Sequence, residues 1–123
     1  MAIAFGLHVV DEAATDFLVW YNPIARQIRV RLGVPFPPTF TFWPWFLGLL
    51  TVTAVLFALV PVAITRDRWI IWLAVVFAII NIGNGLLHIV AATRLGRRVP
   101  GVISAPLLLT CATWLLAVAL GSL

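Results

Sequence analysis

Residues 69–93 read WIIWLAVVFAIINIGNGLLHIVAAT, an apolar run that contains no Asp, Glu, Lys or Arg. A helix needs roughly 20 predominantly apolar residues to cross the hydrocarbon core of a bilayer, so this run predicts a transmembrane helix. Residues 43–65 and 101–123 are also apolar and meet the same length requirement. Together the three runs predict an all-α, polytopic membrane protein folded as a helical bundle.

The composition of the chain agrees with this class. Hydrophobic residues make up 63% of the chain and charged residues only 10%, whereas soluble domains carry roughly 25% charged residues. A chain of 123 residues is expected to form one domain, here a single transmembrane helical domain over residues 1–123. Cys111 is the one cysteine, so no internal disulfide is expected.

The N-terminal third predicts one polar-striped helix and one short basic helix. Residues 2–21 are expected to form the first helix, which ends because Pro23 biases the preceding residue out of the helical region. In residues 24–33, isoleucine and leucine fall on one face and three arginines away from it, which is typical of a helix in the headgroup layer. The predicted architecture is therefore four helices plus a short interfacial basic helix.

All basic residues of this +4 chain are arginines, and they lie between the predicted spans. Arginines in such loops orient a membrane protein, so we expect membrane lipid as a partner and no nucleic acid. Two loops carry three arginines each, whereas the middle loop has two, partly offset by Asp67. The positive-inside rule then places the richer loops in the cytoplasm and both termini outside, in the bacterial plasma membrane. The two richer sets are Arg26, Arg29 and Arg31, and Arg94, Arg97 and Arg98.

The first predicted helix carries polar residues that a lipid-facing helix would not need. His8, Asp11, Glu12 and Thr15 fall at positions i, i+3, i+4 and i+7, which places them on one face of a helix. Asp16 borders this stripe. The face either lies at the membrane surface or turns towards another helix.

The third predicted span carries a second polar stripe. Asn81, Asn84 and His88 are related by i, i+3 and i+7, and Gly85 lies on the same side, where another helix can approach closely. The two amides could simply link helices through hydrogen bonds, and His88 could be an interhelical contact.

The two stripes are expected to face each other, because an acidic group at bilayer depth costs about 2.5–3.5 kcal/mol on insertion scales. Two histidines and one carboxylate are a common ligand set for zinc or non-haem iron. We therefore predict His8, Glu12 and His88 as metal ligands. Asp11 would be a further ligand or proton acceptor, and Asn84 would orient or polarise a lipophilic small-molecule substrate. Glu12, Asp11 and Asn84 are accordingly the predicted catalytic residues.

One geometric condition limits this site. If both helices span fully in parallel, His8 lies near the start of its helix and His88 near the end of its own. At 1.5 Å per residue the two would differ in depth by roughly 20 Å. The site closes only if the first helix is short or displaced towards the cytoplasmic side.

Other functions use the same residues differently. A Glu12–His8 pair could shuttle a proton in a metal-free isomerisation. His8 and His88 could be the axial ligands of a haem in a redox carrier. A non-catalytic subunit or an ion- or proton-binding transporter could use the intramembrane acids, and a transporter this small would have to form a homo-oligomer to surround a pathway.

Two motifs of the chain resemble a known family. LHVVDE at residues 7–12 and NGLLHIVAATRLGRRVPG at residues 84–101 are similar to the small integral membrane proteins with an HXXEE motif, although Asp11 replaces the first Glu. The resemblance implies that the early histidine and acids act together with Asn84, His88 and the Pro100–Gly101 pair. It implies no particular biochemical activity.

Overall fold

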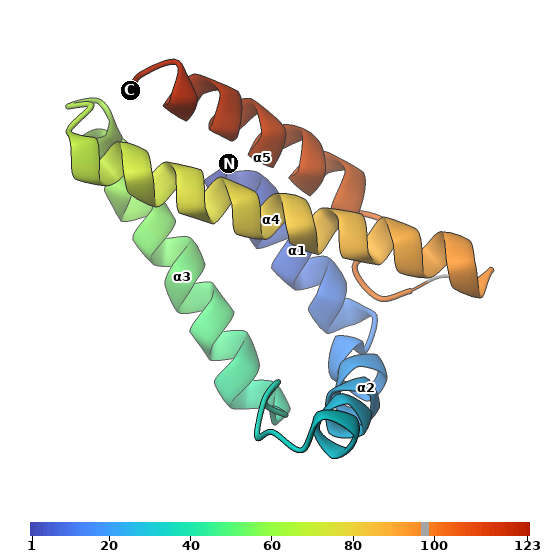
Figure 1. The fold of residues 1–123 in the computed structure, drawn as a ribbon. Helices are drawn as coiled ribbons and strands as arrows, with labels where there is room; N and C mark the ends of the chain where they lie inside the picture. The colour runs from blue at the N-terminus through green and yellow to red at the C-terminus, as the bar shows by residue number, and fades with distance from the viewer. Residues whose placement is uncertain (97–98) are drawn as a thin grey trace.

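A computed structural model describes residues 1–96 and 99–123 of the chain, and these residues fold into five helices with no strand among them. The helices are α1 (Ala2–Ala14), α2 (Phe17–Leu32), α3 (Phe42–Ala63), α4 (Arg68–Leu95) and α5 (Ala105–Leu120) (Figure 1). The predicted all-α class is confirmed. Arg97 and Arg98, two of the arginines used above to predict orientation, lie outside the described residues.

Two helices, α3 and α4, are long and apolar enough to cross a membrane. Their most apolar windows have mean hydropathies of 2.4 and 2.2, and 0% and 33% of these windows is buried inside the protein. Helices so apolar and so little covered by protein are expected to face lipid. The span predicted over residues 101–123 is shorter than its apolar run, because residues 101–104 form turns before α5 begins. Its 16 residues extend about 24 Å.

The predicted end of the first helix at Pro23 is wrong. The chain breaks earlier, at Thr15 and Asp16, where Asp16 adopts a left-handed conformation with φ 57°. Aspartate is one of the few residues that visit this region as single residues. Pro23 lies inside α2, so the predicted basic helix is the second half of α2 rather than a separate element.

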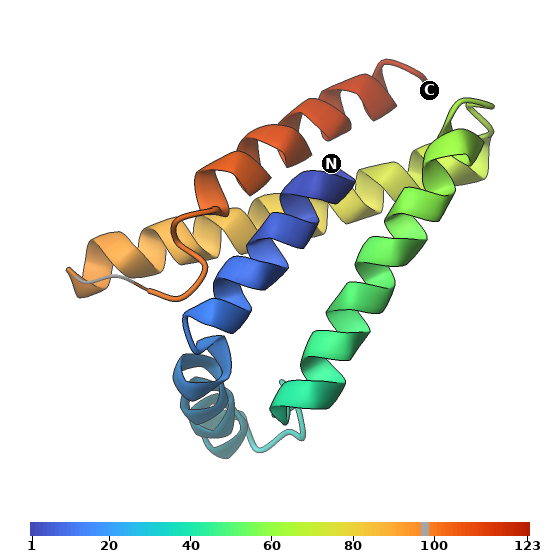
Figure 2. The same cartoon turned by 180° about the vertical axis from the view of Figure 1, so that it is seen from behind.

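The helices α4 and α5 lie side by side along their length (Figures 1 and 2). Gly85 permits the close approach, because a Cβ at this position would lie 3.2 Å from the carbonyl oxygen of Ala105 and 3.2 Å from Cβ of Leu109. α1 packs against α3 and α5. Phe5 and Val9 of α1 form a buried cluster with Leu108 of α5, against which Phe77 of α4 packs.

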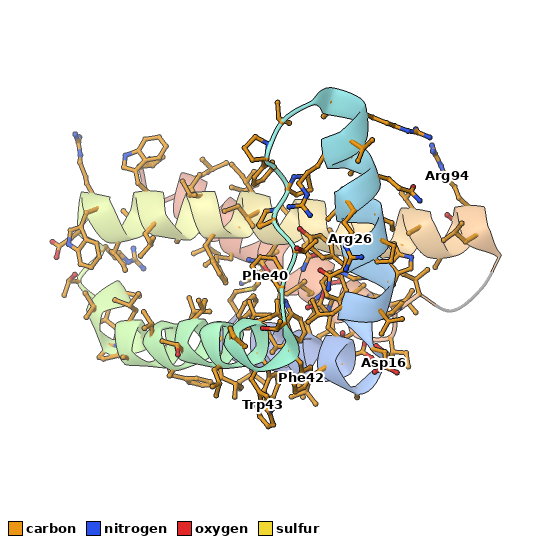
Figure 3. All side chains as sticks on the ribbon, turned by 90° about the horizontal axis from the view of Figure 1, so that it is seen from below. Asp16, Arg26, Phe40, Phe42, Trp43 and Arg94 are labelled. Atoms are coloured by element: carbon orange, nitrogen blue, oxygen red, sulfur yellow. The ribbon has the colours of Figure 1, made fainter. Side chains whose placement is uncertain are left out.

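α1 is short and begins level with the middle of α4, whereas the C-terminus lies near the α3–α4 turn (Figure 2). The depth condition is thereby met, because the C-terminal half of α1 lies beside the C-terminal half of α4. α2 runs crosswise to α3 and α4 (Figure 3), as expected for a helix in the headgroup layer.

Candidate metal centre

His8, Glu12 and His88 meet inside the protein. Oε1 of Glu12 lies 3.0 Å from Nε2 of His88 and 3.5 Å from Nε2 of His8. The three side chains are 1%, 5% and 0% exposed. One ligand atom from each lies within 4.8 Å of the others. The sequence therefore identified three residues that the fold brings together, although Glu12 and His88 are 76 positions apart in the chain.

The separations between these atoms suit a metal ion. Zinc binds histidine nitrogen and carboxylate oxygen at about 2.0–2.2 Å, so neighbouring ligand atoms in a tetrahedral site lie about 3.4 Å apart. Two of the three separations between these ligand atoms, 3.0 and 3.5 Å, are close to this value. Small side-chain adjustments would therefore admit an ion between the three residues.

His8 is held by Ser104, which in turn is held by Asp11. Nδ1 of His8 lies 2.8 Å from Oγ of Ser104, and this hydroxyl donates to Oδ2 of Asp11 over 2.7 Å. The backbone N–H of Ser104 donates to the same oxygen over 2.8 Å. Because the single hydroxyl proton points to the carboxylate, Nδ1 of His8 is the donor to Ser104. Nε2 of His8 consequently presents its lone pair to the centre, as a metal ligand must.

Asn84 occupies the side of the centre next to His8. Its Nδ2 donates to Nε2 of His8 over 3.1 Å. Asn81 is also buried, and its Nδ2 donates to the carbonyl oxygen of Phe77 in its own helix. Of the two amides of the α4 stripe, Asn84 alone contacts the candidate ligands among the residues described.

The Nδ1 side of the His88 ring is surrounded by other rings and is not fixed by a hydrogen bond to a described residue. Nδ1 of His88 is fully buried and has no hydrogen-bond partner among residues 1–96 and 99–123. The imidazole lies against the rings of His8, Phe17 and Trp20, with centroid separations of 4.9, 5.9 and 6.3 Å. A buried polar atom without a partner is uncommon and is often explained by an ion or water that completes the site.

Gly101 covers the centre with its backbone. A Cβ at this position would lie 2.9 Å from Cγ of Glu12 and 2.9 Å from Cε1 of His88, and the φ angle of Gly101 is +77°. Its N–H donates to Oγ1 of Thr15 over 3.2 Å. The hydroxyl of Thr15 also donates to the carbonyl oxygen of Asp11. Thr15, which the sequence places on the polar stripe of the first predicted helix, thus links Gly101, before α5, to the end of α1.

The centre adjoins an open cavity of about 560 Å³. Glu12 lines this cavity together with residues of α2, of the linker after it, and of the first turn of α3. Asp16 is exposed and lines the same cavity, and it does not belong to the group formed by His8, Glu12 and His88. The sequence placed Asp16 beside the stripe, and the fold separates it from the three candidate ligands.

Ser104 is the site residue that the sequence did not reveal. Ser104 lies in an apolar run, and a single serine there forms no motif or periodic stripe that would mark it as a site residue. Gly101 was marked only through the Pro-Gly motif of the family resemblance. Both positions depend on how the α4–α5 connection folds back over α1, which neither periodicity nor composition predicts.

Comparisons with known proteins agree with the motif. A family model described as a protein of unknown function with HXXEE motif matches residues 1–115. No curated protein and no solved structure matches the chain. The motif histidine and second acid are His8 and Glu12, two of the three residues that meet at the centre. Since the match covers nearly the whole sequence, the chain belongs to the HXXEE family.

Proposed function

We propose that this protein is an integral membrane metalloenzyme that binds a divalent cation, zinc or iron, through His8, Glu12 and His88 and acts on a lipophilic small molecule. The single observation that carries the proposal is the convergence of two buried imidazoles on one buried carboxylate oxygen. Asn84 and the Ser104–Asp11 pair complete the surroundings.

Electrostatics favour a cation at this centre. A carboxylate inside an apolar bundle is costly, and ionisable groups at such depth usually serve a function. Two histidines and one carboxylate leave positions open for substrate in zinc and iron enzymes. A cation bound here would supply Lewis acidity or an activated water. Glu12 lines the adjoining cavity, so a substrate in that cavity would lie next to the ligand set.

Residues next to the three ligands would orient His8 and the substrate. Asp11, through Ser104, fixes the orientation and tautomer of His8, a role that outer-shell carboxylates have in many metal sites. Asn84 presents an amide at the edge of the ligand set and would orient a substrate carbonyl or hydroxyl group. Asp11 thus acts through Ser104 and His8 rather than as a direct ligand.

We also propose that α3, α4 and α5 cross the membrane, while α1 enters it only partway from the arginine-rich side. Arg26, Arg29 and Arg94 lie at the end of the molecule where α2 runs crosswise, and Figure 3 shows Arg94 extending from α4 on that side. The positive-inside rule makes this the cytoplasmic end.

Elemental analysis of detergent-purified protein tests the proposed metal centre. Wild type should hold about one equivalent of zinc or iron, and both His88→Ala and Glu12→Gln should lose it, because each change removes one of three ligands. Asp16→Asn is the matched control, since it removes a carboxylate of the same segment that does not meet the imidazoles. A wild type that remains metal-free after reconstitution, or metal that survives both ligand changes, would contradict the proposal.

A metal-free proton relay is the second candidate. Nε2 of His88 donates to Oε1 of Glu12 over 3.0 Å, and Nε2 of His8 lies 3.5 Å from the same oxygen. On its other side, Nδ1 of His8 bonds to Ser104, whose hydroxyl donates to Asp11. Such a chain could move protons in an isomerisation. Activity that resists chelators in protein shown to lack metal would favour it. A haem between the two histidines has no support, because the backbone of Gly101 occupies the space beside both rings.

A further inference from the structure

The cavity beside Glu12 contains charges of both signs. Among the residues that the structure describes, Arg26 is the one basic side chain that lines it, and Asp16 and Glu12 are the acidic ones. Arg26 is exposed, and within the described part of the chain it forms no ion pair with either acid. An arginine held at the wall of a cavity without an internal partner is available to bind an anion through its planar donors.

The rest of the cavity lining is mostly apolar, and four of its residues are aromatic. Phe17 comes from α2, Phe40 from the linker, and Phe42 and Trp45 from the start of α3. The rings of Phe17 and Trp45 are stacked with centroids 5.6 Å apart. Figure 3 shows Arg26, Phe40 and Phe42 where α2, the linker and α3 meet, while Trp43 points away. This combination of apolar walls and one unpaired cation fits an amphipathic ligand.

The linker that forms one wall is fastened to α2. Asn22 donates to the carbonyl oxygen of Phe40 over 2.9 Å and accepts from the N–H of Phe40 over 3.0 Å. The hydroxyl of Tyr21 donates to the carbonyl oxygen of Pro38 over 3.0 Å. These hydrogen bonds fix the linker against α2, so that Phe40 is held in position as one wall of the cavity.

We propose that this cavity binds an amphiphile with an anionic oxygen head, a carboxylate or a phosphate, which Arg26 binds while the alkyl chain lies along the aromatic walls. The inference rests on the metal centre proposed above. A divalent cation with Glu12 as its only charged ligand carries one net positive charge, which adds to that of Arg26. Asp16, which also lines the cavity, carries the opposite charge and reduces this positive potential.

Native mass spectrometry of zinc-loaded protein in a nonionic detergent tests this inference. The probes are dodecanoate and dodecyl phosphate, with dodecylammonium as the cationic amphiphile of equal chain length. We expect saturable 1:1 adducts with at least one anionic probe and none with dodecylammonium. Comparison of the two anionic probes identifies the head group, because both offer the shared chemistry but differ in charge and shape.

The decisive comparison is between two arginines of the same helix. Arg26→Gln should weaken binding of the anionic probe about tenfold or more, since a charge-assisted bond is lost. Arg31→Gln makes the same charge change on α2 outside the cavity and should leave binding within about twofold. Equal effects of the two changes, equally tight dodecylammonium binding, or no saturable adduct would each overturn the inference.

Metal content measured on the same samples separates the two proposals. If Arg26→Gln keeps its metal and loses the amphiphile, both proposals are supported. If wild type cannot be loaded with metal, the metalloenzyme proposal fails, whereas the comparison of Arg26 with Arg31 still decides the fate of the cavity. If metal is bound and the Arg26 change has no effect, the cavity inference alone is wrong.

Discussion

Ser104 and His8 are 96 residues apart in the chain, yet Oγ of Ser104 lies 2.8 Å from Nδ1 of His8. The same hydroxyl reaches Asp11, one turn of α1 further on, at 2.7 Å. The two neighbouring acids of the motif, Asp11 and Glu12, therefore have different roles. Glu12 faces the imidazoles, while Asp11 fixes one of them through Ser104.

Ser104→Ala should lower metal affinity about 10–100-fold while leaving the helical fold intact, because loss of an outer-shell partner releases the orientation of a ligating histidine. Metal titration of purified protein, with circular dichroism as the fold check, measures the effect. Ser104→Thr keeps the hydroxyl and should retain most of the affinity.

Ser122→Ala is the matched control for this prediction. Its hydroxyl donates to the carbonyl oxygen of Val118 in the last turns of the chain, away from the centre. If Ser104→Ala and Ser122→Ala bind metal equally well, His8 does not depend on Ser104.

Gly101→Ala should destabilise the protein by about 1–3 kcal/mol, the usual range for overpacking in a filled interior. The new methyl group would approach Glu12 and His88 to 2.9 Å, and the backbone at φ +77° disfavours any side chain. Metal affinity should fall as well, because the two ligands must move apart. The midpoint of thermal unfolding in detergent and a metal titration report these two losses.

Gly83→Ala provides the comparison, since a Cβ there meets nothing within 4 Å and alanine favours a helix over glycine. It should match or exceed wild-type stability. If the Gly101→Ala protein is as stable as the Gly83→Ala protein, the backbone at residue 101 is not tightly packed against Glu12 and His88.

Asn84→Ala should retain the metal, with an affinity equal to wild type or up to about tenfold higher. Nδ2 of Asn84 donates to Nε2 of His8, so it competes with a cation for that lone pair, and removing a hydrogen bond of about 1 kcal/mol favours the cation. Calorimetric metal titration gives the sign of the change.

Asn81→Ala removes an amide whose Nδ2 donates to the carbonyl oxygen of Phe77 in its own helix and should leave metal affinity unchanged. If Asn84→Ala instead abolishes metal binding while Asn81→Ala does not, Asn84 is a ligand, and the three-residue set proposed above is incomplete.

The orientation of the protein can be read from single cysteines placed in a Cys111→Ser background. Ile64→Cys, in the turn after α3, should react with a membrane-impermeant maleimide in intact cells. Val34→Cys, in the linker after α2, should react only after the membrane is opened, because we propose that the arginine-rich side faces the cytoplasm. Labelling of residue 34 alone in intact cells would reverse the orientation.

The sequence by itself determined the helical class and predicted the three side chains that meet at the centre, His8, Glu12 and His88. Long apolar runs leave few choices besides helices, since every backbone polar group must be paired in an apolar medium. The spacing of His8 and Glu12, and of Asn84 and His88, then fixed which residues share a face. These features are local, so they can be read without a fold.

The tertiary structure alone decided where these faces meet and what holds them. The chain turns at Asp16 rather than at Pro23, which shortens α1 and brings His8 level with His88. Ser104 and Gly101 reach the centre because the connection before α5 folds back over α1. Such contacts join residues nearly a hundred positions apart, and their formation depends on the packing of α1, α4 and α5 together, which no periodicity within one segment encodes.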